Sequence, residues 1–240
     1  MRTFLFVLLI SLVNIVQSIT GFAGAPIAMP PSIALVGVSD AKAALTFIFW
    51  FASLFVTVRN FKEIDLKKLS VMLGFMIVGV VTGMWMFSNL PMTYLMLAYG
   101  IVVVLIGAKK LFFPSQKELP KPARLGALLL SGLMQGMFTS GGPFLALYST
   151  VEIKDKRTFR ATVSTVWTVL NTYMCASMYS KGMYNAYTWK LVGFSVLPVI
   201  GAIIIGNYLN KKMEQQTFLK LVYVLLMISG SLLIFNFFNA

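Results

Sequence analysis

Two short stretches interrupt the apolar sequence and decide what kind of fold this chain forms. The first, residues 20–26, reads TGFAGAP, and the second, residues 139–143, reads TSGGP. Each lies inside a long run without charged residues, over residues 3–39 and 125–151 respectively. Glycine permits left-handed backbone and close approach, and proline can begin a helix but breaks the interior of one. We therefore predict that one helix ends and another begins at each stretch.

The remaining uncharged runs have the length of membrane spans. They cover residues 43–58, 69–108, 161–180, 191–210 and 221–240, and a Ser-Asn-Leu-Pro sequence at residues 88–91 divides the longest of them. Apolar residues make up 58% of the 240 residues and charged residues 11%, whereas a soluble domain has about 25% charged residues. These features predict an all-α integral membrane protein, with the lipid bilayer as its surroundings.

The broken runs are the wrong length for simple spans. The pieces beside the second break have about 14 and 8 residues, too few to cross a core of about 30 Å at about 1.5 Å per residue. We expect both broken segments to be re-entrant and to reach only the midplane. A cleaved signal peptide is an alternative for the first segment, but the same broken pattern recurs in the middle of the chain.

An internal duplication relates the two broken runs. The Gly-Ala-Pro at residues 24–26 matches the Gly-Gly-Pro at residues 141–143 at an offset of 117, and Lys42 matches Arg160 at 118. The repeats are predicted at residues 1–113 and 125–240, with a polar linker at 114–124. Re-entrant breaks give inverted repeats with 16 basic residues on one side and 4 on the other, whereas fully crossing breaks give parallel repeats and a 12 to 8 split. The positive-inside rule favours inverted repeats with both termini outside, each repeat having a broken helix and three spans.

The breaks are also where an anion could bind without a formal charge. A helix that begins there presents free N–H groups and the positive end of its dipole, and nearby hydroxyl and amide groups add donors. The alternative is that the glycines allow helices to pack and that the polar side chains satisfy exposed backbone. For Thr46, Ser164 and Asn171, on the later helices, the alternative is hydrogen bonding between helices. The predicted substrate-binding residues are Ser18, Thr20, Gly21, Gly24, Thr46, Gln135, Thr139, Ser140, Gly141, Gly142, Ser164 and Asn171.

Four further residues have two interpretations each. Lys42 and Arg160 begin the helices after the broken segments, where they either attract anions or only fix the topology. Trp50 and Trp167 lie deep in their runs, where they either wall a cavity or pack against lipid or protein. The motif Gly79-x-x-x-Gly83 indicates helix packing and is assigned no chemistry.

The composition argues against several other functions. The chain has no histidine and one cysteine, Cys175, so we expect no metal site and no His-dependent enzyme. It has no P-loop motif, and its scattered basic residues indicate membrane topology rather than nucleic-acid binding. No carboxylate lies inside an uncharged run, which argues against a proton pump with a buried acidic relay. We predict a protein that is not an enzyme and needs no cofactor.

The broken segments resemble those of the TauE/SafE sulfite exporter family. The resemblance rests on residues 21–25 (GFAGA) followed by Pro30, and on Gly132-x-x-x-Gly136 followed by residues 141–143. Residues 59–65 and 182–189 resemble the family's loop between its second and third elements, and Ala23 and Ala25 stand where many members have glycine. The resemblance covers essentially the whole chain.

The resemblance implies a multi-pass transporter of the inner (plasma) membrane. Its expected substrates are small sulfur-containing anions such as sulfite, thiosulfate or organosulfonates, and the family's name implies that they are exported. Two alternatives stay open, a transporter of another small organic or inorganic anion and a membrane subunit that does not transport. The sequence leaves the identity of the anion, the coupling and the oligomeric state undecided.

Overall fold

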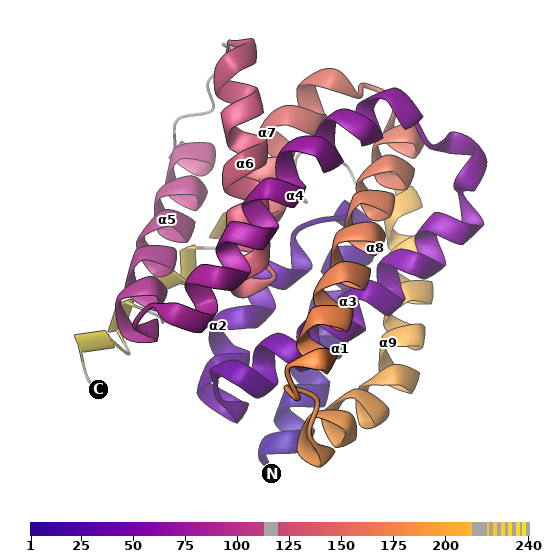
Figure 1. Ribbon diagram of the computed structural model, residues 1–240. Helices are drawn as coiled ribbons and strands as arrows, with labels where there is room; N and C mark the ends of the chain where they lie inside the picture. The colour runs from indigo at the N-terminus through magenta and orange to yellow at the C-terminus, as the bar shows by residue number, and fades with distance from the viewer. Residues whose placement is uncertain are drawn as a thin grey trace.

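The chain folds into a bundle of α-helices, shown as a computed structural model in Figure 1. The structure describes residues 1–112, 120–212 and scattered positions from 220 onward. These residues contain no strand, so the predicted all-helical class is confirmed for them. The elements are α1 (Arg2–Thr20), α2 (Gly24–Val36), α3 (Val38–Arg59), the 3-10 helix η1 (Phe61–Glu63), α4 (Leu66–Asn89), α5 (Met92–Phe112), α6 (Lys121–Phe138), α7 (Gly142–Glu152), α8 (Lys156–Ser180) and α9 (Ala186–Lys212).

Among the described helices, four are long and apolar enough to cross a membrane. They are α1, α3, α4 and the first 24 residues of α9. The helices after the breaks are shorter, with 13 residues in α2 and 11 in α7. At about 1.5 Å per residue these two helices are roughly 20 Å and 16 Å long, which is less than the bilayer core of about 30 Å. Their lengths agree with helices that reach the midplane.

The helices break at the glycine and proline residues. Helix α1 ends at Gly21, whose φ of 81° is left-handed, and α2 begins three residues later at Gly24. Helix α6 ends at Thr139, which has a φ of 56° and is the only non-glycine residue with positive φ in the described part of the chain. Pro143 then lies in the first turn of α7, where its missing N–H costs no helical hydrogen bond.

Glycine pairs bring α4 and α6 into backbone contact. A Cβ added to Gly83 would lie 2.2 Å from the Leu133 carbonyl oxygen, and one added to Gly132 would lie 2.1 Å from that of Met76. Gly79 and Gly136 are equally close to the opposite helix. The structure thus places Gly79-x-x-x-Gly83 in a helix contact, as predicted. Most of the predicted linker, 114–124, lies outside the described residues, but α6 begins at Lys121 and so includes its last four positions.

Helices α3 and α8 cross in opposite directions near the centre of the bundle (Figure 1). Trp50 Nε1 donates a hydrogen bond to Thr172 Oγ1 at 2.8 Å, and about two turns further along α3 the hydroxyls of Thr57 and Thr168 lie 3.0 Å apart. Residues further along α3 therefore pair with residues earlier in α8, so the two helices run in opposite directions. Because the hydroxyls of α8 find partners within the protein, this helix tolerates many threonines at membrane depth.

Candidate functional site

Two side chains near the end of α1 hold the backbone of the first break. Gln17 Oε1 accepts a hydrogen bond from the Gly24 N–H at 2.8 Å, and Thr20 Oγ1 accepts one from the Ala23 N–H at 3.1 Å. The first N–H groups of a helix have no partner within the helix, and here these side chains satisfy them. The predicted site residues Thr20, Gly21 and Gly24 therefore form one closed turn.

The second break is held in the same way by the end of α6. Gln135 Oε1 accepts a hydrogen bond from the Gly141 N–H at 3.1 Å, and the Ser131 hydroxyl donates one to the Gly141 carbonyl at 2.7 Å. Gln17 and Gln135 are 118 residues apart, close to the offset of 117 between the two glycine–proline stretches. Each break is thus capped by a glutamine at the equivalent position of its own repeat.

Helix α8 contacts both breaks. Trp167 Nε1 donates a hydrogen bond to the Gly21 carbonyl at 3.0 Å, and Asn171, one turn later, accepts one from Gln135 Nε2 at 2.7 Å. The two breaks also touch each other, because a Cβ added to Gly142 would lie 2.2 Å from the Phe22 carbonyl oxygen. The predicted residues Gln135, Gly142 and Asn171 are therefore brought together at one point.

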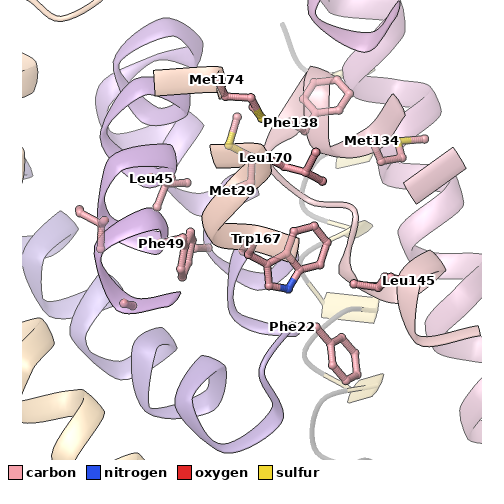
Figure 2. Close-up of a cluster of buried hydrophobic side chains, with 14 of the residues drawn as sticks. Phe22, Met29, Leu45, Phe49, Met134, Phe138, Leu145, Trp167, Leu170 and Met174 are labelled. Atoms are coloured by element: carbon pink, nitrogen blue, oxygen red, sulfur yellow. The ribbon is translucent and has the colours of Figure 1, made fainter. Parts of the chain in front are cut away.

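A small cavity lies where the two breaks meet α3 and α8. Its volume is about 10 Å³, which is room for about one water molecule. Figure 2 shows Trp167 of α8 among Phe22, Phe49 and Leu145 in the buried cluster beside it. The lining residues are Gln17, Phe22, Ala25, Phe49, Gln135, Thr139, Gly142, Trp167 and Asn171.

Equivalent residues of the two halves face this cavity in pairs. Gln17 and Gln135 are one pair, and Phe49 and Trp167 are another at the same offset of 118. Among the described residues that line it, the polar side chains are three amides, one hydroxyl and the indole N–H of Trp167, with no carboxylate. The cavity therefore offers neutral hydrogen-bond donors and aromatic walls.

Thr46 of α3, in the first half, contacts Thr139 of the second break. Their hydroxyls lie 2.8 Å apart, and both side chains are buried. A β-branched residue with positive φ is a strained conformation that costs about 1–3 kcal/mol and often occurs at functional sites. Thr139 takes the position that Gly21 takes in the first half, 118 residues earlier.

Ser140, the neighbour of Thr139, was expected to donate a hydrogen bond into the cavity, but its side chain faces α5. Its Oγ accepts a hydrogen bond from the Tyr99 hydroxyl of α5 at 2.6 Å. The Tyr99 ring stacks on Phe138, with centroids 4.6 Å apart. Ser140 is therefore held by α5, outside the set of residues that line the cavity.

Ser18 and Ser164 are buried but are not among the lining residues either. Ser18 packs against α9, where a Cβ added to Gly206 would lie 2.6 Å from the Ser18 Cβ. The carbonyl of Ser164 accepts a hydrogen bond from Thr168 one turn later in α8. For these two predicted site residues, helix packing explains the burial.

The equivalent basic residues Lys42 and Arg160 each reach the break of the opposite half. Lys42 is 1% exposed, and its ammonium donates a hydrogen bond to the Gly136 carbonyl of α6 at 2.6 Å. Arg160 donates to the Asn207 side chain, and its Cγ would lie 3.9 Å from a Cβ added to Gly21. Both positions are closer to the cavity than a purely superficial topology anchor needs to be.

An ion cluster closes the end of α7 that lies away from the cavity. Glu152 pairs with Lys68 of α4 and with Arg124 of α6, the latter at 3.1 Å. The hydrogen bond from Lys68 holds the pKa of the Glu152 carboxyl below its usual range. The cluster ties three helices, α4, α6 and α7, together.

Sequence reasoning missed Gln17, Phe49 and Tyr99. A signal for Gln17 was present, because it lies 118 residues before Gln135, which was predicted. The same offset from Trp167 leads to Phe49. Trp50, for which the sequence left a cavity wall and packing open, bonds Thr172 at the α3–α8 crossing. Tyr99 gave no signal, because its role depends only on how α5 packs against the second break.

A bundle of membrane-length helices, with two short helices that begin at a central cavity, is the architecture of a membrane transporter. The family described as sulfite exporter TauE/SafE matches residues 6–233, and the chain belongs to this family of membrane transporters. It is 22% identical over 174 residues to the probable inner membrane transporter protein TsaS of Comamonas testosteroni. The aligned residues cover 71% of this chain and 73% of that protein. No solved structure matches the chain.

Proposed function

We propose that this protein exports small sulfur-containing anions, such as sulfite, thiosulfate or organosulfonates, across the inner membrane. The anion binds where the two breaks meet, in the cavity lined by Gln17 and Gln135. The family name supports the substrate class, and the name of the relative supports the inner membrane. The observation that carries the proposal is that equivalent residues of both halves line one central cavity.

The hydrogen bonds at the breaks suggest how a neutral site would accept an anion. The amide oxygens of Gln17 and Gln135 occupy the N–H groups of Gly24 and Gly141. An oxyanion offers stronger acceptors to the same donors, at the positive ends of α2 and α7. When the anion binds, each glutamine side chain turns. Its amide oxygen leaves the backbone N–H group, and its amide N–H₂ group donates to the anion.

The size of the cavity indicates that the described conformation is closed. A space of about 10 Å³ holds about one water molecule, and an oxyanion with three or four oxygens is larger. Substrate entry therefore requires the breaks to separate from α3 and α8. Movement of one repeat against the other around a fixed site is the usual way that transporters of this design work.

The inverted arrangement of the repeats, over residues 1–113 and 125–240, belongs to the same proposal. In inverted repeats the equivalent helices α3 and α8 run in opposite directions, whereas in parallel repeats they run in the same direction. The hydrogen bonds from Trp50 to Thr172 and between Thr57 and Thr168 support opposite directions. Packing of α1 on α9 and of α6 on α4, which are equivalent pairs, supports a two-fold relation between the repeats.

A site without a carboxylate suits movement of the anion alone. The membrane potential, negative inside, drives each elementary negative charge outward by about 2.3 kcal/mol per 100 mV. Backbone and amide donors bind the anion without holding it as tightly as a fixed charge would. We therefore propose electrogenic facilitated transport, in which voltage and concentration set the direction.

Flux from proteoliposomes tests the proposal. Vesicles loaded with sulfite or methanesulfonate, without proton or sodium gradients, are clamped with potassium and valinomycin, and the initial efflux is measured at several voltages. We expect efflux that increases with voltage negative inside. Gln135→Ala removes two hydrogen bonds, each worth about 0.5–1.5 kcal/mol, and should weaken anion affinity several-fold or more. The control is Asn89→Ala, because this exposed amide bonds only the Trp85 carbonyl of its own helix.

Each alternative predicts a different result in this assay. Flux of carboxylates but not of sulfur-containing anions would favour a transporter of another anion, and no flux of any anion would favour a subunit without transport activity. Flux that does not respond to voltage would replace the uncoupled mechanism with a coupled or electroneutral one. Unchanged affinity in Gln135→Ala would move the binding site away from the breaks.

A further inference from the structure

Lys42 is a basic residue buried inside the helix bundle. It is the fifth residue of α3 and is 1% exposed. Moving an ammonium group out of water costs several kcal/mol unless a partner compensates. Within the described residues, the salt bridges are those of Glu152 with Lys68 and Arg124, so no described carboxylate pairs with Lys42.

The groups around the Lys42 ammonium compensate its charge only in part. Its Nζ donates to the Gly136 carbonyl at 2.6 Å and lies 3.2 Å from the centroid of the Phe87 ring. An ammonium has three N–H donors, and the carbonyl uses one of them. The ring face attracts the cation by a cation–π interaction, which a negatively charged ligand would exceed. The site is therefore arranged to hold a cation until an anion arrives.

The position of Lys42 links the protein surface to the cavity. On one side, exposed Lys181 donates a hydrogen bond to Ser88, the residue after Phe87, at 3.3 Å. On the other side, Thr46 lies one helical turn from Lys42 and bonds Thr139, which lines the cavity. The charge distribution assigns Lys42 and Lys181 to the outer side of the membrane. A chain of contacting residues therefore joins the surface at Lys181 to the cavity at Thr139, with Lys42 between them.

The second half repeats this arrangement with Arg160, 118 residues after Lys42. Arg160 lies beside Gly21 of the first break, as Lys42 lies beside Gly136 near the second break. Its Nε is buried and has no hydrogen-bond partner among the described residues. The two basic side chains thus stand on opposite sides of the cavity, one toward each face of the membrane under the inverted topology.

We propose that Lys42 forms an outer subsite for a small oxyanion, which the anion occupies between the central cavity and the outer surface. The proposal rests on the proposed function and deepens it by naming a charged residue that contacts the substrate. When the anion reaches this level, the ammonium leaves the Phe87 ring and binds an oxygen of the anion. Arg160 is the corresponding residue on the inner side.

Kinetics of sulfite efflux, with methanesulfonate as a second probe, test the subsite. In reconstituted full-length protein, Lys42→Gln should lower kcat/KM about tenfold or more, the change expected for one lost charge-assisted hydrogen bond. Lys42→Arg should keep most of the activity, because it retains the charge. The matched control is Lys190→Gln, which removes an exposed lysine on the same side and should leave the kinetics unchanged.

A chemical rescue separates the charge of Lys42 from its packing. In a Cys175→Ser background, Lys42→Cys is treated with 2-aminoethyl methanethiosulfonate, which adds a primary ammonium, or with methyl methanethiosulfonate, which adds a neutral group. We expect only the ammonium reagent to restore efflux. Because both reagents act on the same folded variant, the comparison does not depend on the stability of Lys42→Gln.

The possible results distinguish the subsite from the proposed function. If the wild type moves neither anion, the proposed function fails and the subsite with it. If the wild type transports but Lys42→Gln equals Lys190→Gln, or the neutral reagent restores efflux as well as the ammonium reagent, the subsite is refuted and the proposed function stands. Selective rescue by the ammonium reagent supports the subsite.

Discussion

Gly142→Ala perturbs the point where the two breaks touch. The added Cβ would lie 2.2 Å from the Phe22 carbonyl oxygen and 3.0 Å from its carbonyl carbon, whereas ordinary contacts begin at 3.4 Å. The obstructing atoms belong to backbone, which cannot rotate away as a flexible side chain does. The two breaks must therefore separate by about 1 Å, in an interior that is close-packed.

The expected cost follows from this overlap. Overpacking a well-packed site by one methyl group costs about 1–3 kcal/mol, which in a chain of this size lowers the Tm by roughly 2–12 °C. The matched control is Gly126→Ala in α6, where an added Cβ meets nothing within 4 Å. Since alanine is favoured over glycine inside a helix by about 0.5–1 kcal/mol, this control should keep or raise the Tm.

Two measurements on each purified variant check the prediction. Intrinsic tryptophan fluorescence during heating gives the Tm, and sulfite efflux from proteoliposomes gives the activity. We expect Gly142→Ala to remain folded in the membrane, with a lower Tm and strongly reduced efflux, because the displaced backbone lines the cavity. Wild-type Tm together with wild-type efflux would show that the breaks do not touch as described. A lower Tm with full efflux would show that the contact is structural and that the anion binds elsewhere.

Two further predictions concern the loops. In a Cys175→Ser background, an impermeant maleimide applied to whole cells should label Ser180→Cys but not Asp155→Cys, and the reverse pattern would contradict the inverted topology. Asp155 caps α8 by accepting a hydrogen bond from the Thr158 N–H, which lowers the pKa of its carboxyl. This stabilisation is present above the unfolded-state pKa and is lost as pH falls through the lower folded-state value, so the Tm advantage of wild type over Asp155→Asn should shrink below about pH 4. A difference that stays constant from pH 7 to pH 3 would remove the charge of Asp155 from the explanation.

The sequence alone determined the helical class and the places where the helices break. Both follow from local properties, because long uncharged runs form helices in a bilayer and because glycine and proline restrict the backbone wherever they stand. The contact made by Gly79 and Gly83 was also readable, since small residues four apart always share one helix face. Gln135 was predicted because it lies just before the second break, and the internal offset of 118 would have led from it to Gln17.

Only the tertiary structure decided which of these groups meet and which donors are free. The hydrogen bond from Trp167 to Gly21 and the one from Lys42 to Gly136 join residues that are 146 and 94 positions apart, so they depend on how the helices pack. The sequence predicted open N–H groups at both breaks, whereas the structure fills them with the oxygens of Gln17 and Gln135. The direction in which each side chain leaves its helix decides which partner it meets. It turned Gln135 toward the cavity and Ser140 toward Tyr99, although both lie beside the same break and are polar in the same sequence context.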